Sequence, residues 1–91
     1  MDGVVVLVDG QPLDERYALK KFTSGGFEWT YEGAGPNQLA LALLADHLGD
    51  NQAALDLCEP FMRAIVADFE NDWELTGQEI DEALTRLKAN A

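Results

Sequence analysis

Three side chains suited to nucleophilic catalysis each occur once in this chain of 91 residues: Ser24, His47 and Cys58. Such catalysis needs a hydroxyl or thiol within hydrogen-bond reach of a base. Nothing in their spacing places the three together. His47 is expected to be a partly exposed residue near a helix end, and Cys58, among apolar neighbours, is expected to pack as a small hydrophobe. We therefore expect a protein that is not an enzyme and has no catalytic residue.

Carboxylates alternate along residues 68–74, D-F-E-N-D-W-E, which gives the segment a slight similarity to a calcium-binding loop. Such a loop needs glycine at its sixth position and a glutamate at its twelfth. The sixth position here is Trp73, and Glu79 at the twelfth begins another element. We expect no bound metal and no cofactor.

A glycine turn, G-A-G-P at residues 33–36, precedes an apolar helix. The N-terminus of a helix can hold an anion. A phosphate-binding loop, however, needs a lysine and a run of free N–H groups. Pro36 removes one donor, no lysine follows, and Glu28 and Glu32 lie nearby. We interpret the turn as structural.

Charge is the unusual property of this chain. Its net charge is −11 and its pI is about 4.1. Residues 1–45 carry −3 and residues 46–91 carry −8. A protein this acidic repels the phosphate backbone and anionic lipid surfaces, so we expect no direct binding of nucleic acid and no membrane association.

Seven acidic residues fall within residues 68–82, where no lysine or arginine occurs. They are Asp68, Glu70, Asp72, Glu74, Glu79, Asp81 and Glu82. They form either a solvated face, as in a salt-adapted protein, or a surface for a basic partner, where complementary charge speeds association. Trp73 among them either anchors an interface or packs into the core, and we favour the core.

The first third of the chain supplies the expected strands. Residues 3–8 (GVVVLV) predict a strand that ends at an Asp9-Gly10 turn, and residues 11–15 predict a loop. Residues 16–22 fit either a strand or a helical turn. Residues 27–31 predict a strand with three aromatic rings on one face, which would allow a homodimer if the rings were not fully covered.

The remainder supplies the expected helices. An almost wholly apolar helix should begin at Pro36, run to Leu48 and end at the cap residue Gly49. Asp50 should cap a second helix, which Pro60 should kink or break before it resumes from residue 62 to residue 69.

The last quarter of the chain predicts a linker and a third helix. Residues 71–75 fit a short strand or an extended linker. Thr76 and Glu79 have the spacing of a capping box, and Ile80, Ala83, Leu84 and Leu87 form a helical stripe after them.

The stretch from Phe27 to Asp46 reads F-E-W-x-Y-x-G-x-G-P-x-Q-L-A-L-A-L-L-A-D. It resembles the signature of a small uncharacterised family, a domain of unknown function found in prokaryotes and their viruses. The similarity continues loosely to residue 76. Thr30, Ala34 and Pro60 depart from the pattern. The resemblance implies a phage or mobile-element setting and supplies no catalytic residues.

The predicted fold class is α+β: one domain, residues 1–91, with a small antiparallel sheet of two or three strands packed on two or three helices. With one cysteine and no signal segment, we expect a cytoplasmic protein, a monomer or homodimer. We predict a non-enzymatic interaction protein that inhibits a basic host protein or nucleoprotein complex, in the manner of an anti-CRISPR protein or nucleic-acid mimic. The alternative is an accessory domain whose acidity serves only solubility or salt adaptation.

Overall fold

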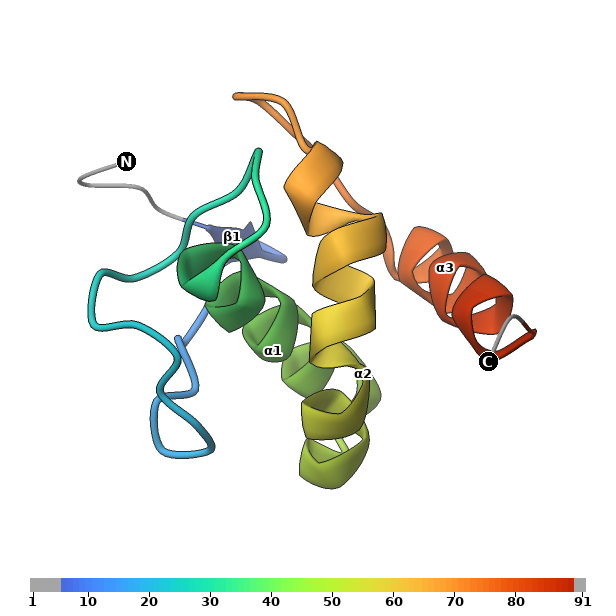
Figure 1. Ribbon diagram of the computed structural model, residues 1–91, viewed down its shortest axis with the longest axis horizontal. Coiled ribbons are helices and arrows are strands. Elements are labelled where there is room, and N and C mark those ends of the chain that lie inside the picture. Colours follow the sequence, from blue (N-terminus) through green and yellow to red (C-terminus); the bar gives the residue numbers. More distant parts are fainter. Residues whose placement is uncertain (1–5, 90–91) are drawn as a thin grey trace.

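Three helices and a small two-stranded antiparallel sheet make up the α+β fold of the computed structural model, which describes residues 6–89. The expected fold class is thus confirmed, and the fold is mostly helical. Helices α1 and α2 lie side by side, with α3 beyond α2 and the sheet on the side of α1 (Figure 1). No helix in the described residues has the length and apolar content needed to cross a membrane.

The sheet is a tight hairpin of β1 (Leu7–Val8) and β2 (Gln11–Pro12). Asp9 and Gly10 form its turn with φ of 52° and 83°, which suits a two-residue hairpin loop. The expected turn is confirmed. The expected loop is wrong at Gln11 and Pro12, because so short a turn returns them directly onto β1. Residues 3–5 of the expected strand lie outside the described residues.

Helix α1 (Ala34–Leu48) forms the centre of the core. Every residue from Gln38 to Ala45 is buried, as the apolar sequence predicts, because neighbouring elements cover the helix on all sides. Gly49 ends the helix with φ of 64° and donates its N–H to the carbonyl of Ala45, so the expected glycine cap is confirmed. The helix begins two residues before the expected Pro36, which still lies in the first turn, where N–H groups lack helical partners.

Helix α2 (Asn51–Ala64) continues through Pro60 without a break. The side chain of Asp50 accepts a hydrogen bond from the N–H of Ala53, which confirms the expected cap. Of the kink or break expected at Pro60, the break does not occur, because packing of one helix face, including Phe61 and Met62, holds the helix together despite the lost hydrogen bond. The helix stops at Ala64, and a single 3-10 turn, η1 (Val66–Asp68), replaces the expected continuation to residue 69.

Residues 27–31 are irregular rather than the expected strand. Thr30 has φ of 80° and donates its N–H to the carbonyl of Val66 in η1, at 3.4 Å. A positive φ turns the chain and ends the alternation of side chains between two faces. Phe27 and Trp29 are therefore buried, at 7% exposure each, whereas Tyr31 is 44% exposed.

The loop before α1 is held by the amide of Gln38, a fully buried polar side chain. Its Nε2 donates to the carbonyls of Glu15 and Lys20 at 2.6 and 3.0 Å, and its Oε1 accepts from the N–H of Phe22 at 2.8 Å. Within this loop, Leu19 donates its N–H to the carbonyl of Arg16. Of the two structures expected for residues 16–22, the helical turn is the one formed.

Helix α3 (Gly77–Ala89) follows an extended linker at residues 71–75, where no strand forms. Thr76 Oγ1 accepts from the N–H of Glu79, and the Glu79 carboxylate accepts from the N–H of Thr76. This confirms the expected capping box. Ile80, Ala83 and Leu84 are buried against the rest of the core.

Candidate interaction surface

All seven predicted partner-binding carboxylates are exposed, but they do not form one uniform set. The three on α3 each contact another group of the chain. Glu79 caps the helix at Thr76, Glu82 accepts from Gln78 at 3.2 Å, and Asp81 lies 2.8 Å from His47. These three carboxylates therefore already have partners within the chain.

The other four lie on the acidic segment, defined as residues 68–74, which runs from the last residue of η1 into the linker before α3. These are Asp68, Glu70, Asp72 and Glu74, and within residues 6–89 none of their carboxylates forms an ion pair. Their charge is therefore available to a partner.

Aromatic packing fixes the acidic segment on the body of the protein. Trp73 stacks on Phe69 with ring centroids 4.2 Å apart and forms a T-shaped pair with Trp29, with ring centroids 5.6 Å apart. Offset and edge-on pairs of this kind contribute about 0.5–1.5 kcal/mol each beyond burial. Trp73 packs on the core, as we favoured from the sequence, yet it is only half-buried.

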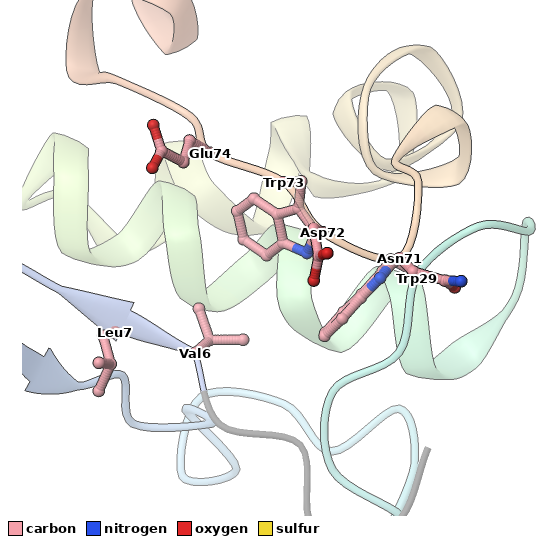
Figure 2. A pocket seen from close by; sticks show the side chains of 7 residues that line it. All are labelled: Val6, Leu7, Trp29, Asn71, Asp72, Trp73 and Glu74. Atoms are coloured by element: carbon pink, nitrogen blue, oxygen red, sulfur yellow. The ribbon is translucent and has the colours of Figure 1, made fainter.

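The exposed part of Trp73 lines an open groove of about 730 Å³ between β1 and the acidic segment. Figure 2 shows the Trp73 ring broadside, with the carboxylates of Asp72 and Glu74 on either side of it in this view. Leu7 of β1 and Val6, which precedes that strand, lie across the groove. Leu7 is 58% exposed. The groove thus combines an apolar wall, made by Val6 and Leu7, with an acidic wall that carries Asp72 and Glu74.

Trp29 also lines this groove. Its indole N–H is buried and has no hydrogen-bond partner within the described residues. An unpaired buried donor costs about 1–3 kcal/mol. The ring stays in place because it packs against Trp73 and the core.

The structure keeps the three residues considered for nucleophilic catalysis in separate environments. His47, in the last turn of α1, contacts Asp81 of α3. The buried Cys58 donates to the carbonyl of Leu55 in its own helix, and burial raises the pKa of its thiol. Ser24 is exposed in the loop before α1.

The anion and metal alternatives gain no support from the geometry. The carboxylate of Glu28 lies against Gly35 at the N-terminal turn of α1, where a side chain on Gly35 would collide with it. A negative charge thus already occupies the end of the helix that would attract an anion. Among residues 6–89, no group of three or more histidine, cysteine or acidic side chains is placed to hold a metal ion.

Comparison with known proteins identifies a family. The model of a family of unknown function, DUF6166, matches residues 1–86. The chain belongs to the DUF6166 family. Neither a search of curated proteins nor a search of solved structures gave a match.

The fold gives physical roles to residues in the stretch by which the chain resembles a family of unknown function. In this DUF6166 member, Gln38 holds the preceding loop, Gly35 makes room for Glu28, and Trp29 supports Trp73. The role of Gln38 was missed from the sequence, because periodicity places the residue on a helix but does not reveal its partners at residues 15–22. The part of Val6 and Leu7 in the groove was missed because it depends on how the hairpin sits beside the acidic segment.

Proposed function

We propose that this protein is a non-enzymatic interaction protein that binds the basic surface of a nucleic-acid-handling protein and blocks it. The observation that carries the proposal is the acidic segment, whose four exposed carboxylates have no ion-pair partner within residues 6–89, on a chain of net charge −11. A basic groove that neutralises phosphates offers the same lysine and arginine side chains to carboxylates.

The charge also supports fast and selective association. Complementary potentials steer two proteins together and raise the association rate, and this gain falls as salt screens the charges. Direct binding of DNA or RNA is disfavoured by the same charge. The partner is therefore a basic protein, which the chain would reach before or in place of its nucleic acid.

A second candidate function has its own observation. The three carboxylates on α3 are engaged by Thr76, His47 and Gln78, which favours a domain whose acidity serves structure and solubility alone. In the first function the acidic segment binds a partner, and in the second it only keeps the protein soluble. Neutralising the segment distinguishes the two.

Affinity capture from a lysate of the source organism tests the proposal. The tagged wild-type chain should retain a basic nucleic-acid-binding protein in about 0.1 M salt and release it in about 1 M salt, where the Debye length falls from about 10 Å to about 3 Å. The fourfold variant D68N/E70Q/D72N/E74Q should retain none. Equal capture by both chains, or capture of no basic protein at low salt, would favour the second candidate.

The proposal includes a phage or mobile-element setting, which the sequence resemblance implies. Genes for phage or defence functions on both sides of the coding gene would support it. A constant housekeeping neighbourhood would contradict this part of the proposal.

A further inference from the structure

The groove beside Trp73 differs from the rest of the acidic surface because an indole ring and two carboxylates meet there. Asp72 and Glu74 flank Trp73 in the sequence, and all three side chains line the groove (Figure 2). The ring is held by Phe69 and Trp29 and so needs no reordering before it is used. Preorganised groups lose less entropy on binding.

The chemistry of the groove matches one side chain better than others. A guanidinium is planar, stacks on indole rings and donates paired hydrogen bonds to carboxylates. The apolar stem of an arginine suits the wall made by Val6 and Leu7, because such stems pack on apolar surface while the head stays with the charges. A lysine supplies the charge but has no planar fork.

We propose that this groove binds an arginine side chain presented by the basic partner, with the guanidinium against Trp73 and between the carboxylates of Asp72 and Glu74. The inference rests on the proposed function, and it assigns the main contact with the basic partner to the groove at Asp72, Trp73 and Glu74. The occupant is argued from charge complementarity: within residues 6–89, neither carboxylate has an ion-pair partner, and no lysine or arginine lines the groove.

Titration with a nona-arginine peptide tests the inference directly. The two tryptophans of the chain, Trp29 and Trp73, both line the groove, so their fluorescence reports binding there. Nona-arginine should change the fluorescence and bind more tightly than nona-lysine. The variant D72N/E74Q should bind nona-arginine about tenfold more weakly, because the guanidinium can no longer form charge-assisted hydrogen bonds with the two carboxylates.

The matched control is D68N/E70Q, which removes the same charge from the same segment outside the groove. It should weaken binding by less than about threefold, as a rim charge does. Equal weakening by the two variants would overturn the arginine site. The proposed function would survive this result, because it requires only that the acidic segment binds a basic partner. Absence of binding by the wild-type chain at low salt would overturn both.

A third variant tests the ring itself. Trp73→Leu, with its fold checked by circular dichroism and its binding measured by calorimetry, should remove the preference for nona-arginine over nona-lysine while retaining charge-driven binding. A folded Trp73→Leu chain that keeps the full preference for arginine would overturn the inference.

Discussion

At the scale of single residues, the amide of Gln38 connects α1 to the loop that precedes it. Three backbone groups of residues 15–22 use this one side chain. A buried polar group without a partner costs about 1–3 kcal/mol. The substitution Gln38→Leu keeps the size of the side chain and should lower the free energy of unfolding by about 2–4 kcal/mol in urea titrations.

Gln52→Leu is the control for this prediction. Gln52 is also on a helix, and its side chain, at an exposed site, bonds only to Asp56 among residues 6–89. Its substitution should change stability by less than about 0.5 kcal/mol. If Gln38→Leu were as mild as Gln52→Leu, the buried amide would not hold the loop.

A second residue-scale prediction concerns Cys58, which is 3% exposed. Burial raises the pKa of this thiol above its ordinary value. A raised pKa in the folded state means that the neutral thiol's contribution to stability is complete below about pH 8.5 and is lost as the pH rises through the raised value.

Folded protein should therefore react with iodoacetamide at least about tenfold more slowly than the same protein unfolded in urea, because the thiolate is the reactive form and burial disfavours it. Urea titrations at rising alkaline pH should show wild-type stability falling more than that of Cys58→Ala. Fast alkylation of the folded chain would contradict the buried, neutral thiol.

At the scale of elements, α2 is weaker than its length suggests. Pro60 lies inside the helix and donates no hydrogen bond, so the carbonyl of Asp56 loses its helical partner. Because Pro60 is exposed, alanine fits there without repacking the core. Pro60→Ala should raise the free energy of unfolding by about 1–3 kcal/mol, measured by urea titration.

The adjacent substitution Glu59→Ala provides the comparison. It removes one exposed ion pair with Arg63, which is worth about 0.3–0.5 kcal/mol at helical spacing. A destabilising Pro60→Ala would show that the proline is accommodated by a local geometry that alanine does not favour.

Local sequence rules predicted those elements whose causes lie close along the chain. Gly49 and Asp50 mark one helix boundary, and the Thr76–Glu79 box marks another, because each cap acts within four residues. The irregular segment at residues 27–31 depends instead on the contact of Thr30 with Val66, far along the sequence. Residue patterns do not contain that contact, so the predicted strand was wrong.

For the candidate site, too, the sequence predicted local properties and not tertiary contacts. Acidic composition predicted exposed carboxylates, and all seven are exposed. Their division into two groups depends on tertiary structure: Asp81 meets His47 across 34 positions of sequence. Residue spacing gives no signal for that pairing or for the hairpin that forms the other wall of the groove.

At the scale of the whole molecule, the acidic residues are placed where their mutual repulsion destabilises the fold little. In the part of the chain that the structure describes, Gln38 is the one polar residue of the core. The acids of residues 68–82 lie outside the core, where water and salt screen their repulsion. The proposed binding surface of the protein is therefore the acidic segment, which is held by the packing of its own Phe69 and Trp73 rings on each other and of Trp73 on Trp29.

Competition with nucleic acid tests this account most directly. A fluorescently labelled nucleic acid is bound to the captured basic protein, the chain is added, and fluorescence anisotropy is followed. We predict displacement of the nucleic acid by the wild-type chain in about 0.1 M salt, weakened in about 1 M salt, and far weaker displacement by D68N/E70Q/D72N/E74Q. Undiminished nucleic-acid binding in the presence of saturating wild-type chain would contradict the account.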